Sequence, residues 1–485
     1  MRGIMIQGTA SDVGKSMICT ALCRIMSDQG IKVAPFKSQN MSNNSYVTVK
    51  GEEIGRAQGV QAEAARILAT VDMNPILLKP ESGMKSQVVL FGKQMATMDG
   101  MDYRTRFYEK GLEAIDQALA NLAKDFSHLV IEGAGSPAEV NLNDRELVNM
   151  AVAKRADVPV ILVADIERGG VFASIVGTLA LVPEPERIKG LIINKFRGDA
   201  QLFEDGVQFL ESHTGIPVLG VIPYMASHEI EQEDSLGVEA VQRIAKVKDS
   251  IELVICRHPY ISNFTDVEPF LNEPDVTIRW AETVQDIGHP DILLLPGTKS
   301  TIADLRYWKQ QGLGVKLQEL KGNTWIVGLC GGYQMLAETL ADPEGHDGLA
   351  VAKEIGFGLV PKLHVHFEKQ KVVQRKSGIV KFTDKEVLVT GYEIHHGNVT
   401  GSESPLIDNG DSSEGYFHDQ LLGTHMHGFF RNPDCRAAFL APIRKQKNLP
   451  LPTPEETKDP FDRWAQHVKS HLDWQKVEEI MEASV

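Results

Sequence analysis

Short runs of β-branched and other apolar residues alternate with longer amphipathic stretches through the N-terminal half of the chain. Turn residues follow six of these runs, which read GIMIQG, KVAPFK, HLVIEGAG, VPVILVAD, KGLIINKF and IPVLGVIPY. Strands that alternate with helical patterns are typical of βαβ units, in which a helix connects two parallel strands. The pattern therefore predicts an α/β fold with a parallel sheet over residues 1–225.

A second set of apolar runs predicts a further α/β domain in the C-terminal half. Its members are IELVICRHP, DILLLPGTKS, TWIVGLCGG, KEVLVTGYEIHHG and GTHMHGFF. An acidic segment, 227–237, and a helix-like connector, 238–250, separate the two sets. We therefore place the domain boundary near Asp249.

After about residue 442, a loop-like stretch precedes an amphipathic helical pattern around FDRWAQHVKSHLDW. The expected organisation is an N-terminal α/β domain at 1–236, a second α/β domain at 250–442 and a loop and helical tail at 443–485.

Composition limits the class of protein. A chain of 485 residues exceeds one ordinary core, and domains of roughly 100 to 200 residues predict two or three. The net charge of -15 argues against a general nucleic-acid or anionic-membrane surface. No apolar run approaches the length of a spanning helix, and the N-terminus lacks signal-peptide features, so we expect a cytoplasmic protein without a membrane partner. Five scattered cysteines do not form a disulfide framework.

A glycine-rich loop, GTASDVGKS, lies between the first predicted strand and a helical pattern. Such a loop points backbone N–H groups at phosphate, so we expect Gly8, Thr9 and Gly14 to bind a nucleotide. Lys15 would neutralise the outer phosphates and Ser16 would reach Mg²⁺. Five residues separate the glycines instead of the usual four, which makes this a lengthened phosphate loop. The alternative is a glycine turn without a ligand.

Three polar residues at predicted strand ends are further candidates. Glu132 and Asp165 each follow an apolar run, and ligands gather at the carboxyl ends of parallel strands. These carboxylates would hold Mg²⁺ or pair with Lys15, although helix-capping or loop carboxylates have the same pattern. Asn194 would contact the adenine edge or cap its strand.

Cys330 ends an apolar run, and a glycine pair and a helical pattern follow it in GLCGGYQML. A buried structural cysteine has no use for these glycines. A nucleophile on a sharp strand-to-helix turn does, because the turn exposes the sulfur and a helix N-terminus favours the thiolate.

The ordered set of motifs resembles the adenosylcobyric acid synthase family, which is glutamine-hydrolysing and acts in cobalamin biosynthesis. The N-terminal half is also similar to dethiobiotin synthetase, whose phosphate loop has the same extra residue, and the C-terminal half resembles class I glutamine amidotransferases. The motifs that carry the resemblance are GTASDVGKS, PFKSQNMSNNS, GRAQGVQAEAA, DMNPILLKP, VIEGAGSPAEVNL, VADIERGGVFAS, NKFRGD, LPGTKST, GLCGGYQML, GYEIHHG and GTHMHGFF.

The resemblance implies an ATP- and glutamine-dependent amidoligase. The family amidates the b, d, e and g carboxylates of adenosylcobyrinic acid a,c-diamide, a corrinoid, through acyl phosphates. Lys37 would meet the substrate carboxylate or the γ-phosphate. We expect four amide side chains to contact the corrinoid rim: Gln39, Asn40, Asn43 and Asn44. The alternative is that they belong to a plain solvated loop.

For the glutaminase half, the resemblance implies Cys330 as nucleophile and His427 as general base, with His425 as the rival by sequence alone. The N–H of Gly331 and a donor near Gly297 would bind the oxyanion. Many class I amidotransferases carry a glutamate two residues after the histidine, but Phe429 stands there. Glu393 is a candidate to orient the imidazole.

Two alternatives compete with this interpretation. A partner-switching ATPase would explain only the first half, and its usual extra lysine would fall at Ala10. A relative that amidates the a and c carboxylates of cobyrinic acid would share the same two domains. A protein-bound transition metal is not expected, because the histidine pairs lack ligand spacing.

Overall fold

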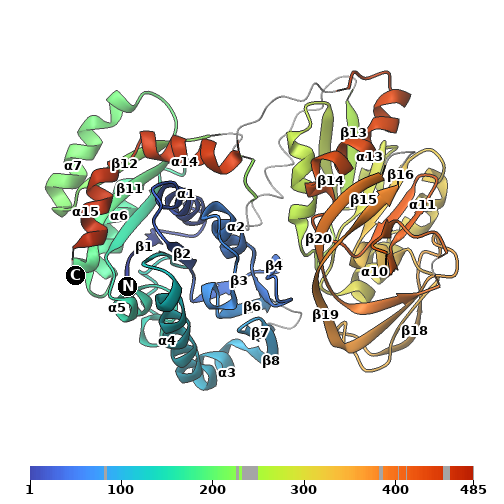
Figure 1. Ribbon diagram of the computed structural model, residues 1–485, viewed down its shortest axis with the longest axis horizontal. Helices are drawn as coiled ribbons and strands as arrows, with labels where there is room; N and C mark the ends of the chain where they lie inside the picture. The colour runs from blue at the N-terminus through green and yellow to red at the C-terminus, as the bar shows by residue number, and fades with distance from the viewer. Residues whose placement is uncertain are drawn as a thin grey trace. The chain divides into compact units, whose positions relative to one another are not determined.

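In the computed structural model, the chain forms two compact units, each with its own sheet and core (Figure 1). The structure describes residues 1–80, 85–225, 229–231, 250–381, 386–401, 403–410, 412–451 and 459–483. Unit 1 consists of Met1–Ser42, Glu52–Ile230 and Glu456–Val485. Unit 2 consists of Asn43–Gly51 and Glu231–Glu455. Apart from residues 229–231 and Ser250, the expected acidic segment, the connector 238–250 and the boundary near Asp249 lie outside the described residues.

The units differ from the expected domains 1–236, 250–442 and 443–485 in two ways. The stretch Asn43–Gly51 groups with unit 2, and Glu456–Val485 groups with unit 1 rather than forming a separate tail. Periodicity predicts the elements but not which distant sheet they pack against.

The six N-terminal apolar runs form one parallel sheet in unit 1, in the order β12-β11-β10-β1-β9-β2. Its central strand, β1, is flanked by β9 and β10, so the carboxyl ends of these three strands lie next to one another. The strands are β1 (Arg2–Gly8), β2 (Val33–Phe36), β9 (His128–Glu132), β10 (Val160–Asp165), β11 (Ile188–Phe196) and β12 (Val218–Pro223).

Helix α1 (Lys15–Asp28) starts at the end of the phosphate loop and packs on this sheet. Its residues Ile18, Leu22 and Met26 recur every four positions and are buried, as expected for the apolar face of a helix. Helix α4 (Tyr108–Asp125) precedes β9, and the helices α5 (Met150–Ala156), α6 (Val171–Leu181) and α7 (Glu204–Thr214) follow β9, β10 and β11 in turn.

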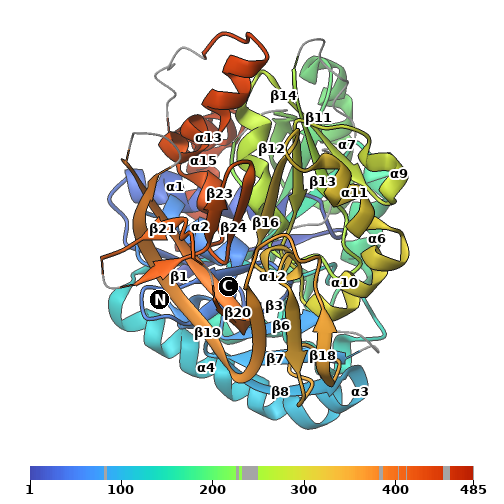
Figure 2. The same cartoon turned by 90° about the vertical axis from the view of Figure 1, so that its right-hand side faces the viewer.

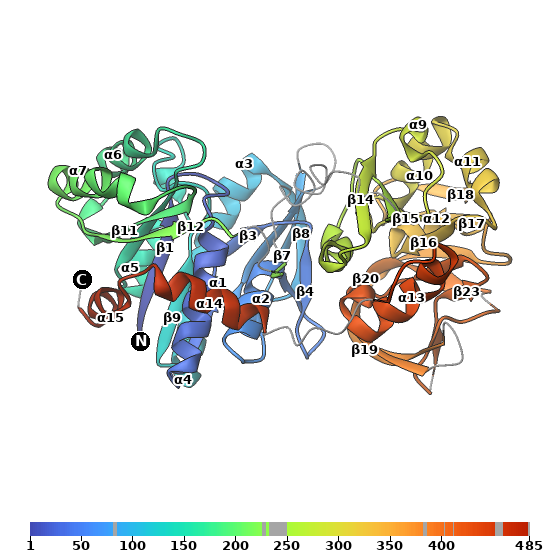
Figure 3. The same cartoon turned by 90° about the horizontal axis from the view of Figure 1, so that it is seen from above.

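The C-terminal helices α14 (Pro460–Ser470) and α15 (Trp474–Glu482) complete the core of unit 1, and α14 lies alongside α1 in Figures 1 and 3. The buried Arg24 of α1 forms ion pairs of 2.7 and 2.6 Å with Asp459 and Asp462. Burial of the apolar face of α14 and these ion pairs explain why the tail joins unit 1.

Unit 1 also contains a four-stranded sheet that the sequence analysis did not predict, in the order β3-β6-β7-β8. Its strands are β3 (Gln39–Met41), β6 (Ile76–Pro80), β7 (Lys85–Leu90) and β8 (Lys93–Asp99); β5 (Glu53–Gly55), α2 (Arg56–Ala64) and α3 (Gly100–Asp102) also belong to unit 1.

The main sheet of unit 2 has the order β14-β13-β15-β16-β24-β23, parallel except for β23. The predicted runs cover β13, β15 and β16, the run GTHMHGFF overlaps β24 only at Gly423 and Thr424, and β14 and β23 were missed. They are β13 (Ile251–Cys256), β14 (Val276–Ala281), β15 (Ile292–Leu295), β16 (Trp325–Leu329), β23 (Tyr416–His418) and β24 (Leu421–Thr424). Among the described residues, the α-helices of unit 2 are α9 (Val284–Ile287), α10 (Thr301–Gln310), α11 (Leu313–Leu320), α12 (Gly331–Met335) and α13 (Pro433–Gln446).

A second sheet of unit 2 is built around a long antiparallel pair, β19 (His364–Lys381) and β20 (Glu386–Thr400) (Figure 2). Only β20 was predicted, because β19 is rich in charged residues. The short strands of unit 2 are β4 (Ser45–Val47), β17 (Thr339–Asp342), β18 (Val351–Ile355), β21 (Ile407–Asp408) and β22 (Ser413–Glu414). In the part of the chain that the structure describes, no helix has the length and apolar character needed to cross a bilayer.

Candidate functional site

The phosphate loop connects β1 to α1, as the sequence predicts. Gly14 has φ 97°, and a Cβ on it would lie 2.1 Å from Asn194 Nδ2, so only glycine fits this position. Asn194 lies near the end of β11, and its Nδ2 donates to the carbonyl of Val13 at 2.8 Å. Its amide nitrogen therefore holds the backbone of the phosphate loop, and the expected contact with an adenine edge stays a prediction.

Lys15 folds back over the loop. Its Nζ donates to the carbonyl oxygens of Ala10 at 3.0 Å and Gly135 at 3.2 Å. Both acceptors are neutral, so phosphate oxygens would replace them favourably. The loop backbone is held to the sheet by Thr9, whose N–H donates to Val163 O at 3.0 Å.

Glu132 lies at the end of β9 and accepts hydrogen bonds from several directions. Its Oε1 accepts from Ser16 Oγ and from Lys37 Nζ, each at 2.8 Å, and its Oε2 accepts from Gln61 at 2.6 Å. Burial would raise the pKa of Glu132, but the Lys37 charge and these donors outweigh burial and lower the pKa below its usual value. The structure thus brings two predicted Mg²⁺ ligands, Ser16 and Glu132, into contact.

Asp165 ends β10, on the other side of β1. Its Oδ2 accepts from Lys195 Nζ at 3.0 Å, and Lys195 also donates to Asp12 O in the phosphate loop at 2.6 Å. The described residues contain no group of three or more His, Cys, Asp or Glu arranged to hold a metal ion. A Mg²⁺ bound by Ser16 and the two carboxylates would therefore take its remaining ligands from phosphate and water, as Mg²⁺ commonly does.

The predicted substrate amides divide between the two units. Asn40 donates to Gln58 at 3.4 Å, and Gln58 in turn donates to Glu132 at 3.4 Å, so Asn40 is linked to the carboxylate site. Gln39 instead accepts from Tyr103, 2.5 Å away. Asn43 and Asn44 belong to the Asn43–Gly51 stretch of unit 2.

Cys330 lies between β16 and α12 with φ 49° and ψ -110°, a strained conformation for a residue with a side chain. Its N–H donates to Thr424 O at 2.7 Å, which ties it to the end of the adjacent β24. A Cβ on Gly332 would lie 2.0 Å from Leu295 O, so the turn needs glycine there. The strand-to-turn-to-helix geometry expected for a nucleophile is present.

His427 is fully buried and interacts with Cys330 and with Asp266. Its Nδ1 lies 2.7 Å from Asp266 Oδ2, and the other oxygen of Asp266 accepts from the Gly428 N–H at 2.7 Å. Burial would lower the pKa of His427, but the charges of Asp266 and Cys330 and their hydrogen bonds raise it to about 10. These contacts favour an imidazolium at His427.

Glu393, the candidate to orient His427, makes other contacts. It accepts from Gln374 at 2.6 Å and from Lys376 at 2.9 Å, both on β19. The partner of His427 Nδ1 is Asp266, which the sequence analysis missed. The sequence does contain a signal for Asp266: it ends the stretch RHPYISNFTD, which follows β13. Ligands gather at the carboxyl ends of parallel strands, so a carboxylate there is a candidate site residue.

His425, the rival base, belongs to a separate buried network. Its Nδ1 is 3.3 Å from Glu414 Oε1, and its Nε2 is 3.2 Å from Gln334 Nε2. Its ring stacks on His395 with centroids 4.1 Å apart. Burial lowers the pKa of His395 to about 2, with a further contribution from His425. Both nitrogens of His425 thus have partners outside the Cys330 and His427 pair.

The two glycines expected at the oxyanion site lie on facing turns. A Cβ on Gly297 would be 3.0 Å from Ser262 O and 3.1 Å from His427 Cε1. A Cβ on Gly331 would be 2.4 Å from Thr298 Cγ2. The turn containing Gly297 and Thr298 therefore approaches both His427 and the backbone beyond Cys330.

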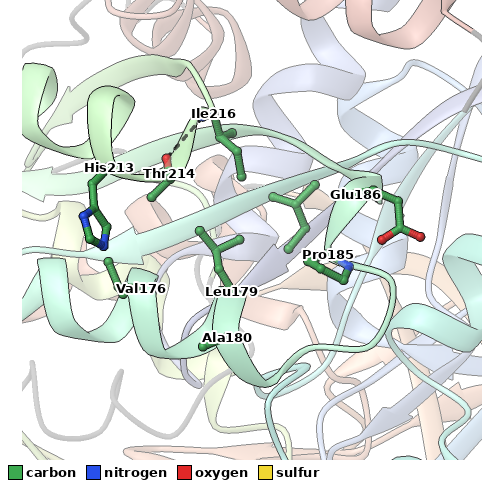
Figure 4. A pocket seen from close by; sticks show the side chains of 9 residues that line it. Val176, Leu179, Ala180, Pro185, Glu186, His213, Thr214 and Ile216 are labelled. Carbon is green, nitrogen blue, oxygen red and sulfur yellow. Dashed lines mark hydrogen bonds between the residues drawn. The ribbon is translucent and has the colours of Figure 1, made fainter.

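A pocket of about 420 Å³ in unit 1 lies apart from these residues, between α6, the start of β11 and the end of α7 (Figure 4). Leu179, Glu186 and His213 are among its lining residues. None of the residues expected to bind nucleotide, substrate or metal lines it.

Both halves of the chain match known families. Residues 4–236 match the CobQ/CobB/MinD/ParA nucleotide binding domain, and residues 252–435 match the CobB/CobQ-like glutamine amidotransferase domain.

Relatives are similar over nearly the full chain. A protein named cobyric acid synthase from Geobacillus thermodenitrificans (strain NG80-2) is 48% identical, covering 99% of this chain and 98% of that protein. A protein of the same name from Desulforamulus reducens (strain ATCC BAA-1160 / DSM 100696 / MI-1) is 44% identical, covering 99% of this chain and 98% of that protein. Another from Nostoc sp. (strain PCC 7120 / SAG 25.82 / UTEX 2576) is 42% identical, covering 98% of this chain and 98% of that protein.

Proposed function

The chain belongs to the cobyric acid synthase family, and on that premise we propose that it converts adenosylcobyrinic acid a,c-diamide to adenosylcobyric acid. It would amidate the b, d, e and g carboxylates, using one ATP and one glutamine for each amide. A carboxylate is a poor electrophile, so ATP first converts it to an acyl phosphate, and ammonia then displaces the phosphate. The cytoplasmic location and the absence of a nucleic-acid partner stay predictions.

Carboxylate activation is assigned to unit 1. The phosphate loop and Lys15 would bind the triphosphate, while Ser16, Glu132 and Asp165 would hold Mg²⁺, which neutralises charge on the transferring phosphoryl group. Lys37 forms an ion pair with Glu132. If Glu132 coordinates Mg²⁺, the Lys37 ammonium would become available to the substrate carboxylate or the γ-phosphate.

Ammonia release is assigned to unit 2. The Cys330 thiolate would attack the carboxamide carbon of glutamine, with the Gly331 N–H and the turn at Gly297 binding the oxyanion. His427 would protonate the departing ammonia, and water would then hydrolyse the thioester to glutamate. Asp266 holds Nδ1 of His427, so the other nitrogen faces the reacting atoms.

The observation that carries this proposal is the contact of His427 with both Cys330 and Asp266 in a chain that also has a phosphate loop. A partner-switching ATPase needs no buried cysteine and histidine pair. An enzyme that amidates the a and c carboxylates of cobyrinic acid would need both units, and it is the second candidate.

The test is incubation with ATP, Mg²⁺, glutamine and the a,c-diamide, followed by mass spectrometry of the corrinoid. Four successive shifts of one acid-to-amide exchange each are expected, and all should require ATP. Cobyrinic acid is supplied in a parallel reaction. Two shifts on cobyrinic acid and none on the a,c-diamide would favour the second candidate and reject the first.

A further inference from the structure

The turn at residues 296–298, which we call the oxyanion turn, follows β15 and carries one of the two proposed oxyanion donors. The Ser262 N–H donates to Gly297 O at 2.9 Å, and the Thr298 hydroxyl bonds to Asp304. Among the described residues, no acceptor takes the Gly297 N–H. This N–H can therefore bind an oxyanion, provided that it points to the side where the oxyanion forms.

The direction of the Gly297 N–H depends on the peptide unit that Gly297 shares with Pro296. No peptide bond among the described residues is cis, and in a trans peptide the C=O and the N–H point to opposite sides. Because glycine has no side chain, the backbone at Gly297 accepts either orientation of this peptide at little cost. A group that holds the Pro296 carbonyl on one side would keep the Gly297 N–H on the other.

His258, in the loop after β13, is such a group. It is 2% exposed, and its Nε2 lies 3.2 Å from Pro296 O. The Trp308 indole of α10 donates to His258 Nδ1 at 2.8 Å, so Nδ1 carries a lone pair. Burial lowers the pKa of His258 to about 3, which keeps the ring neutral. A neutral ring with a lone pair on Nδ1 has its proton on Nε2, and Nε2 therefore donates to Pro296 O.

The two sides of this peptide face different surroundings. The Pro296 carbonyl points to His258, and the partner of His258, Trp308, belongs to an apolar core cluster of unit 2. The Gly297 N–H points away from this partner. The same turn approaches the catalytic pair, since a Cβ on Gly297 would lie 3.1 Å from His427 Cε1. A flipped peptide would turn the Pro296 carbonyl oxygen to the side of the N–H, where it would repel an oxyanion.

We propose that His258 is a positioning residue for glutamine hydrolysis: held in one tautomer by Trp308, it fixes the Pro296 carbonyl and so directs the Gly297 N–H at the oxyanion. This inference rests on the proposed function of Cys330. His258 acts through the peptide and takes no part in proton transfer. The oxyanion exists only while the carboxamide carbon is tetrahedral, so the effect falls on kcat rather than on KM.

The experiment measures glutamate formation by the full-length enzyme with glutamine alone. His258→Leu is close to histidine in volume and removes the donor to Pro296 O. His258→Gln is the rescue variant, because its amide can donate to Pro296 O and accept from Trp308. Leu317→Ala is the control for stability: Leu317 lies in the same apolar cluster as Trp308, and its truncation weakens the core without removing either hydrogen bond. Tm is measured for all three variants.

His258→Leu should lower kcat by about tenfold, the size expected from one hydrogen bond, while KM stays near wild type. His258→Gln should recover most of this loss, and Leu317→Ala should lower Tm but keep kcat. The pH profile of kcat should keep its shape in His258→Leu, because a neutral His258 does not titrate near neutral pH. An unchanged kcat in His258→Leu, or an equal loss in Leu317→Ala, would reject the positioning role.

A second measurement separates loss of the oxyanion donor from general damage to the site. Iodoacetamide alkylates a thiolate by displacing iodide from an sp³ carbon, so no oxyanion forms in that reaction. Its rate with Cys330, followed by mass spectrometry of the peptide, should stay near wild type in His258→Leu while glutamine hydrolysis falls. A matching loss in alkylation would assign His258 to the general structure of the site and overturn the proposal.

These outcomes are distinguishable from failure of the proposed function. The assays use glutamine or iodoacetamide and no corrinoid. A wild type that forms glutamate but gives no corrinoid mass shifts would reject the proposed acceptor, and the variants would still decide the role of His258. A wild type that forms no glutamate would reject both the glutaminase and the role of His258.

Discussion

His427 Nδ1 and Asp266 Oδ2 lie 2.7 Å apart in the interior of unit 2. Asp266 lies in the 3-10 helix Phe264–Asn272 between β13 and β14, and His427 follows β24. The two strands that precede these residues are parallel members of one sheet, so their carboxyl ends face the same edge. Asp266 thus places a carboxylate against the imidazole, whereas Phe429 stands two residues after the histidine.

Asp266→Asn should lower glutamine-dependent amidation by about 10²-fold or more, because the amide no longer holds the Nδ1 proton or balances the imidazolium charge. Amidation from added ammonia should be retained. Glu393→Gln serves as the control and should keep glutamine use near wild type. Kinetics with both nitrogen sources test this, and equal losses in the two variants would remove the special role of Asp266.

The same pair predicts how stability depends on pH. The pKa of His427 is raised to about 10, against roughly 6.5 in an unfolded chain. A raised pKa stabilises the folded state fully below about 6.5, and the contribution is lost as pH rises through about 10. The Tm difference between wild type and Asp266→Asn should therefore shrink from pH 7 to pH 10. A Tm difference that stays constant over this range contradicts an imidazolium at neutral pH.

Lys15→Ala should abolish amidation from both glutamine and ammonia. Acyl-phosphate formation precedes either nitrogen source, and Lys15 provides the positive charge at the phosphate loop. Glutaminase activity measured in parallel shows whether unit 2 of the variant is intact. Ammonia-dependent synthesis at the wild-type rate would reject the assignment of Lys15.

Glu132→Gln and Asp165→Asn should each raise the Mg²⁺ requirement or lower turnover by about 10²-fold, because each removes a negative charge beside the phosphates. Glu132→Gln also removes the ion pair between the buried Lys37 and Glu132, so Tm is measured for both variants. Mg²⁺ titrations that match wild type for both variants would reduce these carboxylates to structural roles.

Cys330→Ser should lose glutamine-dependent amidation, since a hydroxyl has a far higher pKa than a thiol and is not activated by the same histidine. Excess ammonia, at a pH where part of it is unprotonated, should restore amide formation. His427→Ala should behave in the same way. His425→Ala should keep most glutamine use, because His425 contacts Glu414 and Gln334 instead. If His425→Ala loses glutamine use and His427→Ala keeps it, the general base is His425.

The sequence by itself determined the elements that local pattern encodes. Apolar runs bounded by turns predicted all six parallel strands of unit 1, and the glycine spacing predicted the loop between β1 and α1. Cys330 was found in the same way, because a nucleophile elbow is a short local structure with a glycine signature. Family membership was also evident from the ordered motifs and is confirmed by the relatives.

Only the tertiary structure decided which distant residues meet. No local pattern connects Asp266 to His427, Lys37 to Glu132, or Val47 to Arg375, because each pair joins segments that adopt their positions when strands assemble into a sheet. The same reason explains why helix α14 joins unit 1: its apolar face and the partners of Arg24 are satisfied only by a core built from the other end of the chain.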